Sequence, residues 1–215
     1  MLSIERRGGS ILTYTGRTFW PLDPRPEDID VRDIAHALSL QCRFSGHCRE
    51  FYSVAQHSCL VAEAAAQVNL AYALPGLLHD ASEAYLIDLP SPLKRADGFE
   101  TYRAAEHRAM GVIWCQWPGQ VLPPNVSVVL VTEAVHLADE RLLRTEVRDL
   151  MPMPSAASFP WLIEDVDPLP YQIRPVSPKV AERGFLDMAV AYSTGGKRAA
   201  AKALAFLERC KAGAK

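Results

Sequence analysis

Apolar residues recur three and four positions apart along most of this chain, which is the spacing that places side chains on one face of an α-helix. Polar residues separate them, so each such segment predicts a helix with one buried face. The segments cover residues 31–38, 54–68, 75–84, 97–117, 128–142, 178–192 and 197–211. The pattern therefore predicts an all-α protein.

Two stretches depart from the helical pattern. In residues 11–20, β-branched and aromatic residues flank Thr15-Gly16, which predicts a small N-terminal β-hairpin. Residues 151–178 are rich in proline, with aromatic residues between the prolines. Because aromatic side chains favour burial, we expect an irregular segment packed across the domain rather than a flexible linker. Its aromatic residues are Phe159, Trp161 and Tyr171.

Local sequence signals mark where several helices begin and end. Asp30 can accept a hydrogen bond from the first turn of the helix that follows it. Ser53 and Gln56 form the Ser-x-x-Gln pattern of a capping box, in which each side chain bonds the other residue's backbone N–H. We expect Pro118-Gly119 to end one helix and Pro123-Pro124 to precede the next.

Composition places the chain among single-domain proteins of a reducing compartment. It has 215 residues, of which 49% are hydrophobic, and a formal charge of −2. One domain over residues 1–215 accounts for this length, and the charge offers no general attraction to nucleic acid or to a membrane. Five scattered cysteines indicate free thiols. Residues 1–9 lack the apolar core of a signal peptide, so we expect a soluble cytoplasmic protein.

Two histidines fall where the helical pattern predicts the protein interior. His57 lies three residues after Val54 and four before Val61, on the apolar face of its predicted helix. His79 follows Leu77-Leu78 in a strongly apolar segment. A lone inward histidine is more often a core residue with its hydrogen bonds satisfied than a metal ligand, so the interpretation of His57 depends on its neighbours.

Two carboxylates occupy similar positions. Asp80 follows His79 directly, and Asp139 lies on the apolar face of the helix predicted over residues 128–142. Burying a carboxylate costs several kcal/mol unless it is paired or bound to a metal. An ion pair of Asp139 with Arg141 or Arg144 is the alternative, but neither spacing brings the two side chains together on a helix.

Together these side chains predict a metal site of two imidazoles and two carboxylates, formed by His57, His79, Asp80 and Asp139. This mixed set of nitrogen and oxygen ligands suits Zn, Mn, Fe, Co or Ni better than Ca or Mg. Glu83 and Asp88 follow closely in the sequence. They can orient a water on the metal or hold a second ion.

The order His57, His79-Asp80, Asp139 on helices resembles the HD-domain phosphohydrolases. His-Asp-Ala-Ser-Glu at residues 79–83, followed by Asp-Leu-Pro-Ser-Pro-Leu-Lys at 88–94, is similar to the branch that contains bacterial 5′-deoxynucleotidases. Four further runs look closer still to the phage deoxyadenosine triphosphohydrolases, which remove dATP where 2-aminoadenine replaces adenine. These runs are residues 19–24, 33–39, 43–47 and 145–151. The resemblance covers about residues 16–153 and leaves 154–215 as a C-terminal helical extension.

The resemblance implies an HD-domain helical bundle and a role for each candidate residue. The four residues of the predicted metal site match the family's metal ligands, and Glu83 matches the residue that positions or deprotonates the attacking water. Asp88 matches a sugar-hydroxyl contact or an additional metal ligand. The implied substrate contacts are Arg43 and Lys94 for phosphate, with Trp20 and Pro92 as walls of a base pocket.

From this resemblance we expect metal-dependent hydrolysis of a deoxynucleoside triphosphate, with dATP preferred. Attack of metal-bound water on the α-phosphorus would release deoxynucleoside and triphosphate. Two alternatives stay open, a 5′-deoxynucleotidase that acts on monophosphates and a catalytically silent HD module that binds nucleotide. We also expect a homo-oligomer, with no nucleic-acid or membrane partner, located in the host cytoplasm if a phage encodes it.

Overall fold

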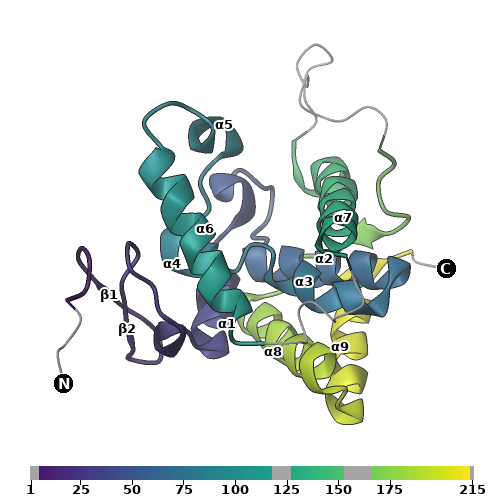
Figure 1. Ribbon diagram of the computed structural model, residues 1–215. Coiled ribbons are helices and arrows are strands. Elements are labelled where there is room, and N and C mark those ends of the chain that lie inside the picture. The colour runs from purple at the N-terminus through teal and green to yellow at the C-terminus, as the bar shows by residue number, and fades with distance from the viewer. Residues whose placement is uncertain (1–4, 118–126, 153–165, 214–215) are drawn as a thin grey trace.

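The computed structural model describes residues 5–117, 127–152 and 166–213, and within these ranges the chain is mostly helical (Figure 1). The α-helices are α1 (Val31–Leu40), α2 (Val54–Val68), α3 (Ala73–Leu78), α4 (Glu83–Leu86), α5 (Ser91–Lys94), α6 (Glu100–Trp114), α7 (Val128–Leu150), α8 (Pro178–Thr194) and α9 (Lys197–Arg209). Short 3-10 helices lie at η1 (Pro26–Asp28), η2 (Arg43–Gly46) and η3 (Leu70–Tyr72). The predicted helical class with a small N-terminal hairpin is confirmed.

Helix α2 lies at the centre of the fold. It contacts α1, α3, α7 and α8, and Figure 1 shows α7 on one side of α2 and α3, with α8 and α9 on the other. Every residue from Val54 to Ala62 is buried, so other elements surround this stretch on all sides. The predicted apolar stripe was wrong at its end, because Val68 is 67% exposed.

The C-terminal helices complete the same core. Helix α8 packs against α1, α2, α3 and α9, and its buried residues belong to one cluster with those of α2 and α7. Gly195 ends α8 with φ +67°, a left-handed conformation that glycine adopts without strain, at the predicted break.

The predicted N-terminal hairpin is confirmed, and it is anchored to α1. Strand β1 (Ile11–Leu12) pairs antiparallel with β2 (Thr18–Phe19), and Ile11 faces Phe19 in the register. The carboxylate of Asp33 in α1 accepts hydrogen bonds from the Thr15 backbone N–H at 2.6 Å and from the hydroxyls of Thr13 and Thr15 at 2.9 Å. The hairpin is therefore held at a fixed position beside α1.

Both predicted N-caps are present, but one capping box is incomplete. Asp30 accepts from the Arg32 N–H at 2.9 Å, and Ser53 accepts from the Gln56 N–H at 3.1 Å. The Gln56 side chain turns away from Ser53. Its amide donates to the Arg174 carbonyl at 2.8 Å and accepts from the Val176 N–H at 2.9 Å. These backbone groups give a fully buried Gln56 two partners, where the capping box would give it one.

Residues 172–212 contain a second small sheet that the sequence pattern did not predict. Strand β3 (Gln172–Ile173) pairs antiparallel with β4 (Lys211–Ala212), so the last helix ends at Arg209 rather than at 211. Tyr171, just before β3, is buried as expected. Other predictions fall on residues outside the described ranges, namely Phe159, Trp161, Pro118-Gly119 and Pro123-Pro124.

The helix predicted over 75–84 is interrupted. Helix α3 ends at Leu78, and the chain passes through two tighter turns before α4 begins at Glu83. The Ala81 N–H donates to the Leu78 carbonyl, and the Glu83 N–H donates to that of Asp80, both at 3.0 Å, and each bond spans three residues rather than four. His79 and Asp80 therefore lie at a helix end and not within a helix.

Smaller differences concern the neighbouring elements. Helix α5 follows Pro90 where the sequence suggested only a corner, and α6 is shorter at both ends than the predicted 97–117. Val128, predicted as core, is 58% exposed. No helix within residues 5–117, 127–152 and 166–213 combines the length and apolar character needed to cross a membrane.

Two helical glycines provide a test of the packing. A Cβ on Gly184 in α8 would lie 2.5 Å from the Phe206 ring of α9, whereas a Cβ on Gly111 in α6 meets no described atom within 4 Å. We expect Gly184→Ala to lower the free energy of unfolding by about 1–3 kcal/mol through overpacking. Gly111→Ala should raise it by about 0.4–1 kcal/mol, because it restricts the unfolded chain. Urea unfolding of both variants measures this, and equal effects would show that α8 and α9 do not pack this closely.

Candidate metal centre

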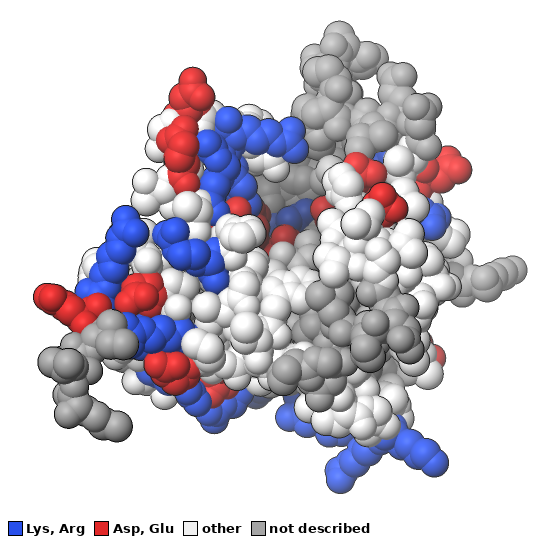
Figure 2. Space-filling model, in the orientation of Figure 1, with Lys and Arg blue, Asp and Glu red and all other residues white. Residues whose placement is uncertain are grey.

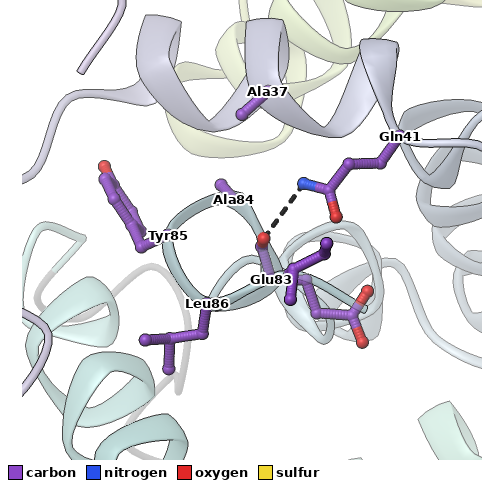
Figure 3. Close-up of a pocket in the computed structure, with 7 residues that line it drawn as sticks. Ala37, Gln41, Glu83, Ala84, Tyr85 and Leu86 are labelled. Carbon is purple, nitrogen blue, oxygen red and sulfur yellow. Dashed lines mark hydrogen bonds between the residues drawn. The ribbon is translucent and has the colours of Figure 1, made fainter. Parts of the chain in front are cut away.

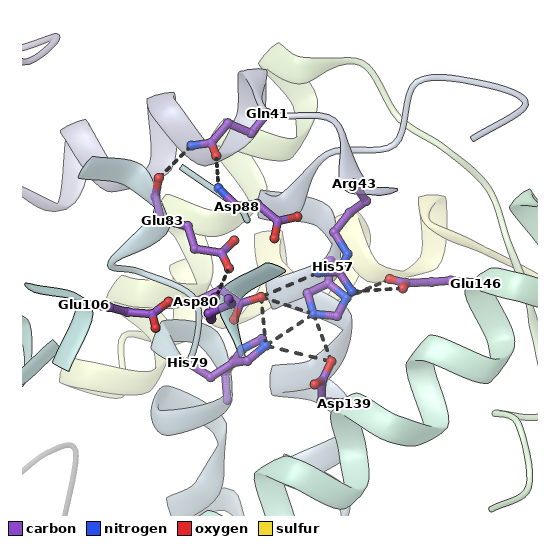
Figure 4. A network of polar contacts seen from close by, with 12 residues as sticks. Gln41, Arg43, His57, His79, Asp80, Glu83, Asp88, Glu106, Asp139 and Glu146 are labelled. Carbon is purple, nitrogen blue, oxygen red and sulfur yellow. Dashed lines mark hydrogen bonds and ion pairs between the residues drawn. The ribbon is translucent and has the colours of Figure 1, made fainter. Parts of the chain in front are cut away.

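Three separate parts of the chain bring the predicted metal ligands together (Figure 4). His57 comes from the first turn of α2, His79 and Asp80 from the residues that follow α3, and Asp139 from the middle of α7. The Nε2 atoms of His57 and His79 are 3.2 Å apart. His57 Nε2 lies 3.2 Å from Asp139 Oδ1, and His79 Nε2 lies 4.0 Å from the same oxygen.

Asp80 adds a fourth ligand atom. Its Oδ2 lies 3.1 Å from His79 Nε2 and 3.5 Å from His57 Nε2. Atoms bound at about 2.1 Å to one tetrahedral or octahedral ion are about 3.0–3.4 Å apart when they occupy adjacent positions. The ligand atoms of His57, His79 and Asp139 all lie within 4.8 Å of one another. These residues therefore form a group that can hold a metal ion.

The orientation of both imidazoles favours a cation between them. His79 Nδ1 lies 2.8 Å from the Gly76 carbonyl, and His57 Nδ1 lies 2.7 Å from Glu146 Oε1. Both partners are acceptors, so in a neutral imidazole each Nδ1 carries the hydrogen and each Nε2 directs a lone pair into the cluster. Two lone pairs and nearby carboxylate oxygens repel each other unless a proton or a metal ion lies between them.

The electrostatics of the cluster also favour positive charge. Burial alone lowers the pKa of His79, but Asp80 and Asp139 outweigh it and raise this pKa to about 9. Burial and Arg43 lower the pKa of His57, yet Glu146 and Asp139 leave it above its usual value. Burial raises the pKa of Asp139, but its contact with His57 dominates and lowers this pKa to about 2. The donor set therefore fits a divalent ion.

The cluster is closed on one side and open on the other. The side chain of His57 is fully buried, whereas those of His79, Asp80 and Asp139 are 15%, 21% and 35% exposed. Figure 2 shows acidic and basic side chains inside a hollow between the part of the molecule that carries α5 and α6 and the part that carries α7. A ligand can therefore approach from the side of Asp139.

Glu83 and Asp88 lie on the far side of Asp80 in Figure 4. Glu83 is 5% exposed, and its Oε2 has no hydrogen-bond partner among the described residues. Burial, reinforced by Asp80 and Asp88, raises the pKa of Glu83 to about 9. The Gln41 amide donates to the Glu83 carbonyl at 3.0 Å and accepts from the Asp88 N–H at 3.2 Å. Gln41 therefore fixes the backbone that carries both acidic residues.

The two predicted phosphate contacts have different surroundings. Arg43 is largely buried, with Nη2 3.3 Å from Glu146 and Nη1 3.8 Å from Asp80, and its Nε lacks a partner within the described part of the chain. Lys94 lies 2.6 Å from Glu106 and 3.9 Å from Glu83. Arg43 therefore borders the metal cluster itself, and Lys94 lies on the Glu83 side.

The two predicted base-pocket walls lie apart from the pocket beside Glu83. This pocket has a volume of about 550 Å³ and is lined, in the described structure, by Ala37, Gln41 and residues 83–87 (Figure 3). Trp20 carries the Arg6 guanidinium 4.2 Å above its ring, and Pro92 is exposed in α5. The base contacts of Trp20 and Pro92 remain predictions.

Sequence reasoning missed Glu146 and Gln41. Glu146 lies seven residues after Asp139 on α7, two helical turns away, so both side chains share one face of that helix. This spacing was the available signal for Glu146. No sequence signal pointed to Gln41, because its partners Glu83 and Asp88 lie more than 40 residues away in the sequence.

Comparison with known proteins identifies relatives but no activity. No family model matches the chain. It is 40% identical over 140 residues to the uncharacterised protein YfdR of Escherichia coli strain K12. The aligned segment covers 65% of this chain and 71% of YfdR. It is also 43% identical over 148 residues to the uncharacterised protein RCAP_rcc00048 of Rhodobacter capsulatus, and this alignment covers 63% of this chain and 70% of that protein.

Metal binding at this cluster has a direct thermal test. We expect Mn²⁺ or Co²⁺ at 100 times its dissociation constant to stabilise the protein by about 2.7 kcal/mol, because the ion binds the folded state alone. For a chain of this size this raises the melting temperature by roughly 5–10 °C. Asp139→Asn should remove most of the shift. Glu140→Gln, which neutralises the adjacent residue paired with His136, should keep it; loss in both variants would place the ion elsewhere.

Proposed function

The chain belongs to the family of the Escherichia coli protein YfdR, and for this member we propose metal-dependent hydrolysis of deoxynucleotide phosphates. The single observation that carries the proposal is the convergence of His57, His79, Asp80 and Asp139, with both Nε2 atoms 3.2 Å apart and facing the carboxylates. These residues also have the order found in HD-domain phosphohydrolases. We propose that they hold Mn, Co, Zn, Ni or Fe, and that Glu83 and Asp88 orient the attacking water or, as the alternative, hold a second ion.

The charge of the cluster supports a phosphate substrate. With neutral imidazoles, the carboxylates of Asp80, Asp139 and Glu146 and the guanidinium of Arg43 give a net charge of −2. A divalent ion would cancel this charge, neutralise phosphate oxygens and acidify an attacking water. Arg43 borders the candidate ligands, and its buried Nε–H has no partner among the residues that the structure describes. Because its Nη1 lies 3.8 Å from Asp80, Arg43 can donate to a phosphate oxygen bound at the cluster.

Glu83 is the proposed proton acceptor. Its pKa of about 9 arises from burial and from the negative charges of Asp80 and Asp88. Positive charge at the cluster opposes this repulsion and favours ionised Glu83. The unpartnered Oε2 can then accept a hydrogen bond from a water that is aligned with the phosphorus. Gln41 contributes by keeping the Glu83 backbone in place.

The proposed substrate is a deoxynucleoside triphosphate, dATP in particular, cleaved at the α-phosphorus. Support for dATP comes from the resemblance of residues 33–39 and 43–47 to the phage triphosphohydrolases. A 5′-deoxynucleotidase is the second candidate, because Glu106 lies 2.6 Å from Lys94 and offsets charge that a triphosphate tail would use. A silent nucleotide-binding module is less well supported, since Glu83 adjoins the four ligands.

Two substitutions separate metal binding from chemistry. Asp80→Ala should abolish both bound metal and hydrolysis, because it removes an oxygen that lies within 3.5 Å of both imidazole Nε2 atoms. Glu83→Gln should keep the metal and lower kcat by about 10²–10⁴-fold through loss of the proton acceptor. Metal analysis by mass spectrometry and a phosphate-release assay measure the two effects. Asp97→Ala, at an exposed position, is the control, and an active Asp80→Ala enzyme would refute the metal mechanism.

The products distinguish the two substrate classes. We expect dATP to yield deoxyadenosine and tripolyphosphate, detected by ion chromatography. Because Lys94 lies beside Glu83, Lys94→Ala should raise KM for dATP about 10-fold more than for dAMP. Exposed Arg95→Ala is the neighbouring control. Equal losses on both substrates, with orthophosphate released from dAMP, would favour the 5′-deoxynucleotidase, and binding without turnover would favour the silent module.

A further inference from the structure

Glu146 is a fully buried carboxylate that neither the metal cluster nor the substrate contacts account for. It lies on α7, and its Oε1 accepts a hydrogen bond from His57 Nδ1 at 2.7 Å. Its Oε2 lies 3.3 Å from Arg43 Nη2. Burying a carboxylate is costly, and removing one partner of such a pair leaves an uncompensated charge. A group of this kind therefore needs a structural or functional reason.

We propose that Glu146 is a positioning residue, which holds the His57 imidazole with its hydrogen on Nδ1 and its Nε2 lone pair directed at the metal ion. This inference rests on the proposed metal site. Metal-binding histidines commonly donate their second N–H to a carboxylate or a carbonyl, which fixes the ring and its tautomer. The contacts of His57 match that arrangement.

The alternative tautomer of His57 is unfavourable at this position. With the hydrogen on Nε2, the lone pair of Nδ1 would face the lone pairs of Glu146 Oε1 at 2.7 Å. The Nε2–H would then point toward His79 Nε2 and Asp139 Oδ1, both at 3.2 Å, and would occupy the place of the ion. Glu146 therefore selects the tautomer that can bind metal.

The two histidine ligands are oriented by different means. His79, just after α3, donates to the backbone carbonyl of Gly76, three residues earlier in the chain. His57 depends instead on a side chain 89 residues away. Because Asp139 and Glu146 share one face of α7, this helix supplies both a ligand and the group that orients another ligand. The position of α7 thus sets two elements of the site together.

Arg43 links Glu146 to the ligands. Its guanidinium lies between Glu146 and Asp80, with Nη atoms at 3.3 and 3.8 Å from their oxygens. Both described side chains that contact Glu146, the guanidinium of Arg43 and the Nδ1–H of His57, are donors, which suits a carboxylate that accepts. The opposing interpretation is that Glu146 serves only as a buried ion-pair partner for Arg43. This predicts loss of stability on substitution, but no change at His57.

Co²⁺ titration and imidazole NMR distinguish these interpretations. We expect Glu146→Gln to weaken Co²⁺ binding about 10–100-fold, because an amide can present either a donor or an acceptor to Nδ1. In long-range ¹H–¹⁵N spectra without metal, recorded at a pH above 9 where the imidazoles are neutral, His57 should be protonated on Nδ1 alone in the wild-type protein and a mixture of tautomers in the variant. Glu133→Gln, an exposed position on the same helix, is the matched control and should change neither measurement.

A double variant guards against misfolding. Arg43→Met with Glu146→Leu removes both charges, so neither is left buried alone, and it should also weaken Co²⁺ binding and release the tautomer. Unchanged Co²⁺ affinity with His57 still protonated on Nδ1, in either folded variant, would overturn the proposal. If instead the wild-type chain bound no Co²⁺, the proposed metal site would be wrong as well, so the two failures are distinguishable.

Discussion

Mutual repulsion at the ligand cluster is the constraint that the rest of the structure must overcome. The Nε2 atoms of two imidazoles lie 3.2 Å apart beside the carboxylates of Asp80 and Asp139, so with both rings neutral two lone pairs would meet there. Nothing in this group holds it together without positive charge. The packing of α2, α3 and α7 provides the opposing force, because the apolar side chains of Val54, Leu60 and Val61 on α2 are fully buried. Hydrophobic contacts therefore maintain an arrangement that electrostatics alone would disperse, and a cation makes it favourable.

Gly76 shows how closely the helices must approach. A Cβ at this position would lie 3.0 Å from the Ala62 Cα, a very tight contact that would push the backbones of α3 and α2 apart. The carbonyl of the same residue accepts the hydrogen bond from His79 Nδ1. One residue thus sets both the distance between two ligand-bearing segments and the orientation of one ligand. A side chain at position 76 would disturb both.

Local pattern was sufficient to place the individual elements and the direction of the site residues. The helical spacing around His57 predicted an inward side chain, and that residue is fully buried. The caps at Asp30 and Ser53 and the hairpin about Thr15-Gly16 were likewise local signals, and the structure confirms them. The metal-binding and catalytic roles of the site residues stay predictions.

Features that depend on distant partners could not be predicted. Gln56 looked like half of a capping box, but the backbone at 174–176 competes for its amide. Glu146 meets His57 across 89 residues, and Gln41 meets Glu83 across 42. Helical periodicity predicts the face of the helix on which a residue lies. It does not predict which side chains of a neighbouring element lie opposite that residue. The residues that complete the site are therefore those that sequence reasoning missed.

The Glu83 side of the site depends on a strained turn. Ile87 has φ +66°, a conformation that costs a branched residue about 1–3 kcal/mol. Gln41 spans this residue, since it bonds the Glu83 carbonyl before it and the Asp88 N–H after it. These two hydrogen bonds offset the strain and keep both carboxylates near the cluster. Gln41 directly follows α1, and α1 is itself fixed by its contacts with the hairpin and with α8. These contacts therefore hold Gln41, and through it the strained turn at Ile87, in place. One set of contacts thus positions the candidate ligands on α2, on α7 and after α3, and another positions the acidic residues around α4.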